Sequence, residues 1–377
     1  MIMYNYPYII LQGGDFFYMQ RRTAWDVVIT SALIGVISII VHWFMGKDKS
    51  IKLTGNSTFY TSVGIGIAVM IAVYMIGHNL IAKRAKEIAV GMILILIFLR
   101  FQPDNMYIGF GTVRALTAAL LCLYVPVYGA ILHKYRHGGL LELLKAILWM
   151  IVPLLIIHKP TRVMTELVLL TSMMMQLLFC AKKRWFKINL LSFLAAVAVI
   201  VLAATVFADK TGVVSRWGHK TMSNVFHLDD STVQSFFDVN LVGSSGKENL
   251  KFLPKPDLDY LLAYQANRYG LLPAIGIALL VIVVIAIGYK SVFRCKNDLS
   301  FLMGTGCLNV LFENTVMNIF ENMGVMPYTD TFLPFFSSQT SYIVMAYIFV
   351  GIILSVCKGK GTRDRFFRYA VRNLMRY

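Results

Sequence analysis

The chain has 377 residues, of which 58% are hydrophobic and only 15% are charged. A soluble domain could not bury so large an apolar fraction, so the composition excludes a soluble globular protein and indicates a chain that crosses a membrane several times. The formal net charge is +17, from 36 Lys and Arg against 19 Asp and Glu. These basic residues cluster in short loops and in the C-terminal tail, which is typical of membrane topology signals rather than of nucleic-acid binding.

Ten apolar runs come close to the roughly 20 residues that a helix needs to cross a bilayer. We therefore predict an all-α polytopic membrane protein in which residues 1–377 form a single membrane domain. The long polar segment 209–268 separates the seventh run from the eighth and is predicted to be a large extracytoplasmic loop. The ten predicted spans lie near residues 24–45, 59–78, 88–102, 112–132, 142–158, 163–180, 188–208, 269–289, 299–320 and 339–357.

The basic residues predict the orientation of these spans, because Lys and Arg near the ends of spans resist translocation. An even number of spans places both termini on one side of the membrane. The more basic face, which includes the tail 358–377, is expected to be cytoplasmic, and the tail itself is expected to lie on anionic lipid. The loops of this face hold Arg21, Arg22, Lys83, Arg84, Lys86, Lys134, Arg136, Lys182, Lys183, Arg184, Lys187, Lys290, Arg294 and Lys296.

The spacing of cysteine and histidine predicts neither a disulfide framework nor a metal site. The five cysteines lie in apolar spans or in predicted cytoplasmic loops, outside the polar segment. His219 and His227 are eight residues apart without a third ligand nearby. Nucleic acid is not expected as a partner.

Two motifs in the C-terminal third resemble a known family. The first ends the polar segment and consists of Leu253-Pro254, Asp259, Tyr260, Ala263 and Gly270. The second covers the ninth run and the loop after it, and it consists of Asn314, Asn318, Gly324, Pro327, Leu333-Pro-Phe-Phe-Ser337 and Ser341. In this order and at this distance they are similar to the SEDS glycosyltransferases, the FtsW/RodA/SpoVE family, which also has ten helices with a long loop after the seventh.

The resemblance implies a peptidoglycan glycosyltransferase of the bacterial cell membrane that serves cell elongation, division or sporulation. Its substrate would be lipid II, the undecaprenyl-diphosphate-linked disaccharide-peptide, polymerised with inversion at the sugar. Its partner would be a transpeptidase of the class B penicillin-binding kind. Asp259 matches the essential aspartate of the family, and its place where a polar loop meets an apolar span suits a general base. The alternative for Asp259 is a carboxylate that caps a helix.

The remaining candidate site residues would contact the substrate. A departing diphosphate needs positive charge, for which Lys159, Arg162, Lys255 and Arg268 are candidates. A divalent cation is the alternative, and no other cofactor is expected. Three further candidate contacts are Asn314, Asn318 and Ser337, for which hydrogen bonding or packing inside the bundle is the alternative reading.

The chain also departs from the pattern of the family. Lys159-Pro-Thr-Arg-Val-Met-Thr165 stands where the family has Gln-Pro-Asp-Leu-Gly-Thr, and Asn267-Arg268 replace paired glutamates. Ser338 to Thr340 replace a pair of glycines. Two alternatives to an active enzyme therefore stay open: a catalytically impaired SEDS-like scaffold, and a flippase or transporter for a lipid-linked precursor. Few intramembrane charges and no visible broken-helix repeat argue against transport.

Overall fold

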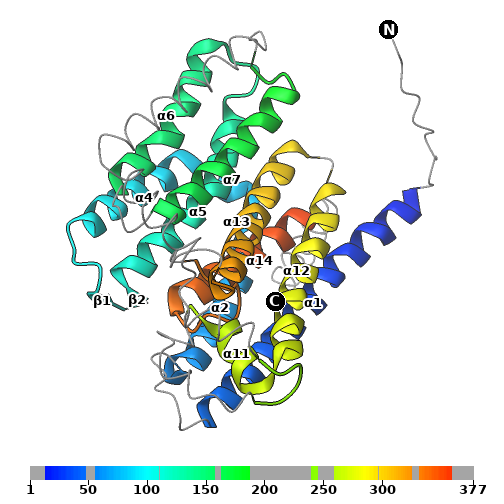
Figure 1. Ribbon diagram of the computed structural model, residues 1–377. Helices are drawn as coiled ribbons and strands as arrows, with labels where there is room; N and C mark the ends of the chain where they lie inside the picture. Colours follow the sequence, from blue (N-terminus) through cyan, green and yellow to red (C-terminus); the bar gives the residue numbers. More distant parts are fainter. Residues whose placement is uncertain are drawn as a thin grey trace, which may run out of the picture.

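The computed structural model describes residues 13–47, 56–109, 111–157, 163–186, 239–244, 259–295, 297–324 and 331–358. These residues are mostly α-helical (Figure 1). Strands β1 (Tyr107–Ile108) and β2 (Gly111–Thr112) form a short antiparallel hairpin that leads into α5. The helices are α1 (Gly13–Lys47), α2 (Asn56–Ile76), α3 (His78–Lys83), α4 (Ala85–Arg100), α5 (Val113–Lys134), α6 (Leu140–Ile157), α7 (Val163–Lys182), α11 (Leu261–Tyr269), α12 (Leu271–Phe293), α13 (Asp298–Asn322) and α14 (Thr340–Cys357).

The chain is a multi-pass membrane protein. Among the described helices, α1, α2, α5, α6, α7, α12 and α14 are long and apolar enough to cross a membrane. Helix α4 has only 16 residues, and α13 contains more polar side chains, although both lie on predicted spans. The predicted span 188–208 and most of the predicted loop 209–268 lie outside the described residues. The end of that predicted loop contains a helix of its own, α11.

Helix α12 shows how the apolar sequence is divided between the bundle and the lipid. Its residues Leu272, Ile275, Leu279 and Val283 recur at helical spacing and are exposed. The opposite face, which includes Ile277, Val281 and Ile285, is buried. Because lipid is as apolar as a protein core, a helix at the edge of a membrane bundle can be hydrophobic on all sides.

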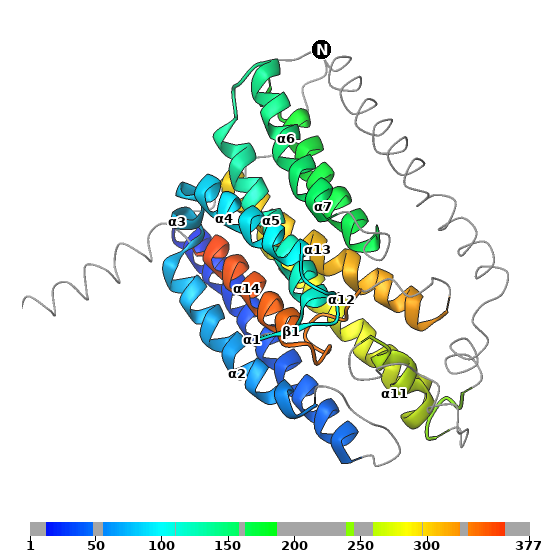
Figure 2. The ribbon, with the colours of Figure 1, turned by 90° about the vertical axis from the view of Figure 1, so that its left-hand side faces the viewer.

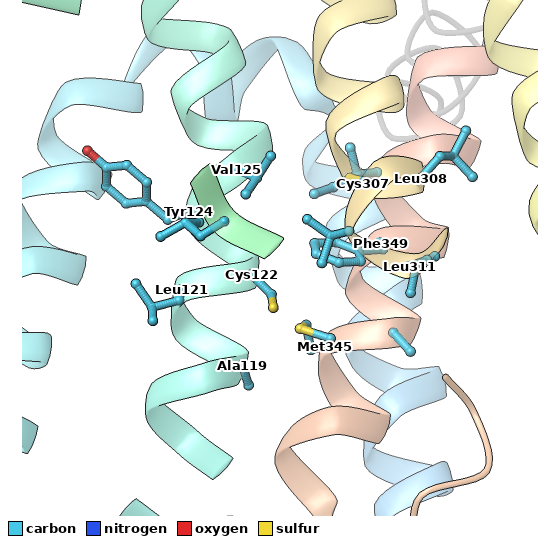
Figure 3. Packing of buried hydrophobic residues seen from close by; sticks show 14 of the residues in the cluster. Ala119, Leu121, Cys122, Tyr124, Val125, Cys307, Leu308, Leu311, Met345 and Phe349 are labelled. Carbon is cyan, nitrogen blue, oxygen red and sulfur yellow. The ribbon is translucent and has the colours of Figure 1, made fainter. Parts of the chain in front are cut away.

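Helix α13 lies at the centre of the bundle and packs against α5, α7, α12 and α14. In Figure 3, Cys122 and Val125 of α5 point toward α13 and α14, which contribute Cys307, Met345 and Phe349 to the same cluster. Tyr124 points away from this cluster, and its hydroxyl donates to the carbonyl of Trp149 in α6 at 2.8 Å. The more polar helix is therefore sheltered by its neighbours, which is where an intramembrane helix with hydrogen-bonding side chains is stable.

Helix α14 packs closely along α2, with α1 beside them (Figure 2). A Cβ atom at Gly351 of α14 would lie 2.8 Å from the carbonyl oxygen of Met70 in α2, so this approach needs glycine. The ring of Tyr347 in α14 lies against Gly66 of α2, and its hydroxyl lies against Gly35 of α1, so a Cβ atom at either glycine would meet Tyr347. Small residues at helix contacts increase van der Waals packing, which drives helix association where lipid removes the hydrophobic effect.

A buried histidine joins α3, α13 and α14 at one end of the bundle. The Nδ1 atom of His78 lies 3.0 Å from the hydroxyl of Ser355, and its Nε2 atom lies 3.0 Å from the hydroxyl of Ser300. The backbone N–H of His78 also donates to Ser355 at 2.8 Å. Ser300 is the third residue of α13, so this contact fixes one end of the central helix.

Candidate functional site

Asp259 lies just before α11, at the end of the bundle where α13 finishes. Only 7% of its surface is exposed, and the helix that follows is buried from Leu261 through Asn267. The N-cap residue of α11 is Tyr260, whose side chain makes no capping hydrogen bond. One interpretation of the sequence made Asp259 the residue that caps a helix. In the structure it lies one residue before the N-cap position of α11.

The first turn of α11 is capped from another helix. The Oδ1 atom of Asn322, the last residue of α13, accepts a hydrogen bond from the backbone N–H of Ala263 at 3.0 Å. This N–H is the third of the helix, one of the donors that have no partner inside a helix and that an N-cap side chain usually satisfies. Asn322 thus replaces a local cap and ties α11 to α13.

The carbonyl oxygen of Asp259 receives two hydrogen bonds from α13. The Nδ2 atoms of Asn318 and Asn322 both donate to it, each at 3.0 Å. The two asparagines are one helical turn apart, and Asn322 also donates to the carbonyl oxygen of Asn318 at 2.8 Å. Both side chains are completely buried, so these bonds form away from water, where hydrogen bonds are electrostatically stronger.

Asn318 connects the two sequence motifs in space. Its Nδ2 atom also donates to the carbonyl oxygen of Thr331 at 3.3 Å, two residues before the Leu333-Pro-Phe-Phe-Ser337 stretch. The hydroxyl of Thr331 donates to Oε2 of Glu321 at 2.9 Å, which is a second contact between this loop and α13. The Asp259 motif and the loop motif therefore meet on one face of α13, formed by residues 318, 321 and 322. We call this set of contacts the α13 clamp.

The loop after Thr331 is a buried turn. The backbone N–H groups of Phe336 and Ser337 both donate to the carbonyl of Leu333, at 3.2 and 3.0 Å. Phe332 stacks on Tyr342, with ring centroids 4.2 Å apart, and Phe335 meets Tyr347 edge to face. These aromatic contacts fix the loop to α14, so the second motif belongs to the packed bundle rather than to a free surface loop.

The far end of α11 is fixed by a separate strand-like contact. The backbone N–H groups of Gly243, Leu271 and Leu272 bond to the carbonyls of Tyr269, Asn240 and Leu241 at 2.9 to 3.1 Å. Gly270, the glycine of the first motif, has a φ of +105° at this joint. A Cβ atom there would lie 2.7 Å from backbone atoms of Leu241 and Val242, so the sharp turn from α11 into α12 requires glycine.

Of the other predicted site residues, Arg268, Asn314 and Ser337 lie in the part of the chain that the structure describes. Arg268 is half-buried on α11. Asn314 is buried one turn below Asn318, and its amide donates to Val310 of its own helix at 2.9 Å. The Ser337 hydroxyl is buried and has no hydrogen-bond partner among the described residues. Lys159, Arg162 and Lys255 lie outside the described residues.

Four polar residues near the site were not predicted from the sequence. Glu321, Asn322 and Thr331 belong to the α13 clamp, and Gln265 of α11 has a buried Nε2 atom that lacks a partner among the described residues. A signal for Asn322 was present, since Asn314, Asn318 and Asn322 recur every four residues along one face of a helix. No three His, Cys, Asp or Glu side chains gather in the described part of the chain in a way that could hold a metal ion.

Comparison with known proteins is consistent with this arrangement. The sequence profile of the FtsW/RodA/SpoVE family, described as "Cell cycle protein", matches residues 21–361. A putative peptidoglycan glycosyltransferase FtsW of Mesostigma viride is 25% identical over 181 residues, which are 46% of this chain and 42% of that protein. The match thus spans under half the length of this relative. A probable peptidoglycan glycosyltransferase FtsW of Hydrogenovibrio crunogenus is 23% identical over 360 residues, covering 86% of this chain and 90% of that protein.

Solved structures show a similar fold. A chain from a peptidoglycan synthase complex, in a study of how polymerisation and crosslinking are coordinated, superposes with a TM-score of 0.65 at 16% identity, covering 91% of this chain and 98% of that one. The rod shape determining protein RodA of Thermus thermophilus superposes with a TM-score of 0.59 at 15% identity, covering 88% and 96%.

Proposed function

Because the chain belongs to the FtsW/RodA/SpoVE family, we propose that it is a peptidoglycan glycosyltransferase that polymerises lipid II. The observation that supports this most directly is the meeting of the two motifs at the α13 clamp, where Asn318 bonds to both Asp259 and Thr331. The curated relatives above bear the name peptidoglycan glycosyltransferase, which supports the same reaction class.

In this proposal Asp259 is the general base. Its carboxylate takes the proton from the hydroxyl of the acceptor sugar while that oxygen attacks the anomeric carbon of the donor. The bond from this carbon to the diphosphate breaks on the opposite face, and the configuration inverts. A base must come within roughly 2.6–3.2 Å of the hydroxyl oxygen whose proton it removes, so the reaction depends on where the segment at Asp259 is held.

The departing diphosphate requires charge stabilisation on the face opposite the base. We assign this role to Arg268, which lies nine residues after Asp259 on α11, and to Lys159, Arg162 and Lys255. A divalent cation is the alternative. The hydroxyl of Ser337 and the amide of Gln265 are buried without partners among the described residues, and hydroxyl groups of a sugar would supply those partners.

We place the enzyme in the bacterial cell membrane, with both termini in the cytoplasm and Asp259 toward the outer side. Its partner is a transpeptidase of the class B penicillin-binding kind, and it serves cell elongation, division or sporulation. A solved structural relative comes from a complex described as coordinating polymerisation with crosslinking, which supports a partnership of this kind.

The test is polymerisation of purified lipid II by the wild-type chain and by Asp259→Asn, each with and without a candidate transpeptidase. Removing the base should lower polymer formation by about 10²–10⁴-fold. Asp298→Asn is the matched control, because Asp298 is at the opposite end of α13 and forms an exposed pair with Lys183 at 2.9 Å. It should retain wild-type activity, since exposed ion pairs contribute little to stability.

Two results would contradict the proposal. If Asp259→Asn formed as much polymer as the wild-type chain, Asp259 would not be the general base. No polymer from the wild-type chain under either condition would favour the scaffold alternative.

A further inference from the structure

We infer that Asn322, acting with Asn318, is a positioning residue that holds Asp259 at the place from which it removes the acceptor proton. This inference deepens the proposed function and rests on it. Asn322 lies one helical turn beyond Asn318, and the asparagines of the second motif are Asn314 and Asn318.

Asn322 contacts both ends of a single turn. Its Nδ2 atom donates to the carbonyl of Asp259, and its Oδ1 atom accepts from the N–H of Ala263, both at 3.0 Å. One amide group therefore fixes the chain at the start and at the end of the five residues from 259 to 263. An amide suits this role, because it has a donor and an acceptor and carries no charge that would be costly to bury.

Asn318 sets the position of Asp259 relative to the loop motif. Its Nδ2 group has two hydrogens, and it bonds to the carbonyls of Asp259 and Thr331 at 3.0 and 3.3 Å. The carbonyl of Asp259 accepts from both asparagines, so the backbone at this residue is fixed from two points on α13. Asn318 therefore fixes the Asp259 backbone relative to both the central helix and the loop.

The consequence for catalysis follows from the two bonds that Asn322 makes at this end of α11. Tyr260 gives no side-chain cap, and the contacts of Gly270 fix the far end of the helix. Without Asn322, the first turn of α11 loses its cap, and the Asp259 carbonyl loses one of the two hydrogen bonds that it accepts from α13. A displacement of about 1 Å at a reacting group can cost roughly 10²-fold in rate.

The experiment uses Asn322→Leu in the full-length chain, with kcat and KM measured for lipid II polymerisation. The leucine side chain has the same number of heavy atoms as asparagine and also branches at Cγ, but it forms no hydrogen bonds, so both contacts disappear without a large cavity. We expect kcat to fall by at least about tenfold while KM changes by less than about threefold, because the loss affects the base rather than substrate binding. In a matched control, Thr315→Val, the deleted hydroxyl bonds to Leu311 of its own helix and to no other residue that the structure describes, and kcat should stay near wild type.

A double-mutant cycle separates positioning from general destabilisation. If Asn322 acts through Asp259, then Asn322→Leu should lower the residual rate of Asp259→Asn by much less than it lowers the wild-type rate. A purely structural role would lower both rates by the same factor. Equal factors, or a wild-type kcat for Asn322→Leu, would overturn the inference.

Hydrogen exchange gives a readout that does not depend on activity. In Asn322→Leu, the amides from residue 260 to 266 should exchange faster than in the wild type, and in Thr315→Val they should not. Unchanged exchange of these amides in Asn322→Leu would show that Asn322 does not hold this turn, even if activity fell. A wild-type chain that makes no polymer would overturn the proposed function instead, and exchange would still decide whether Asn322 holds this turn.

Discussion

At the scale of single residues, neutral amides and one hydroxyl carry the contacts that join the two motifs. Asn318 and Asn322 bond to backbone carbonyls of the Asp259 segment and of the loop, and Thr331 bonds to Glu321. Inside a membrane bundle, such groups supply directional contacts without the cost of burying an unpaired charge. Asn318, predicted as a candidate substrate contact, makes these internal bonds, and a substrate contact by it remains a prediction.

The contact between Thr331 and Glu321 can be tested at this scale. In Thr331→Val, a methyl group replaces the hydroxyl that donates to the buried Oε2 atom of Glu321 at 2.9 Å. A buried acceptor that loses a donor should destabilise the fold by roughly 1–3 kcal/mol, seen as a lower midpoint of thermal unfolding in detergent.

The control for this prediction is Thr305→Val on the same helix. The Thr305 hydroxyl bonds to Phe301 and Leu302 of its own helix, so its removal breaks no contact between segments. Equal unfolding midpoints for the two variants would show that the contact between the loop and α13 adds no stability.

At the scale of elements, α11 is held between two different joints. Its first turn is capped by α13, and its last turn meets the segment 239–244 through backbone hydrogen bonds. Gly270 makes the second joint sharp enough for α11 to turn directly into the membrane span α12. A short helix that would be marginal alone is thus fixed by tertiary contacts at both ends.

Gly270→Ala tests the second joint. The added Cβ atom would meet backbone atoms of Leu241 and Val242 at 2.7 Å. The φ of residue 270 is +105°, a backbone conformation that residues with a side chain rarely adopt. Strain of this kind costs on the order of 1–3 kcal/mol, so we expect a clearly lower unfolding midpoint and faster exchange in α11.

Gly276→Ala, six residues further along α12, is the control for this variant. Nothing lies within 4 Å of a Cβ atom at Gly276, and alanine is favoured inside a helix by about 0.5–1 kcal/mol, so this variant should be as stable as the wild type or more so. If Gly270→Ala had the same unfolding midpoint as Gly276→Ala, the joint between α11 and α12 would not need glycine.

At the scale of the whole molecule, α13 connects two differently built ends. Its 25 residues extend over roughly 37 Å. The first end has the exposed pair of Lys183 with Asp298 and the contact of Ser300 with His78. The second end has the α13 clamp and α11. The excess of basic residues near the first end predicts that it faces the cytoplasm and that Asp259 lies toward the outer side.

Cysteine labelling in whole cells tests this orientation. Val242, next to the α11–α12 joint, and Lys183, at the end of α7, are both exposed. Val242→Cys should react with a membrane-impermeant maleimide in intact cells, and Lys183→Cys should react only after the membrane is permeabilised. The opposite pattern would reverse the predicted topology. The unsubstituted chain is the control, since four of its five cysteines are buried.

The sequence by itself determined the class of the fold and most helix positions, and it predicted Asp259 as the main site residue, which stays a prediction. Spans such as α5, α12 and α14 could be located because the bilayer requires long apolar runs, which are local properties of the chain. Asp259 and the Leu333-to-Ser337 stretch could be proposed as candidates because a motif is also local. Only the tertiary structure decided that α11 is a helix, that Asn318 and Asn322 hold Asp259, and that Glu321 bonds to Thr331. The bonds to Asp259 join residues that are far apart in the chain, since α11 and α12 lie between residue 259 and residue 322. The partners are set by how α11 and the loop pack on α13, which no local pattern specifies.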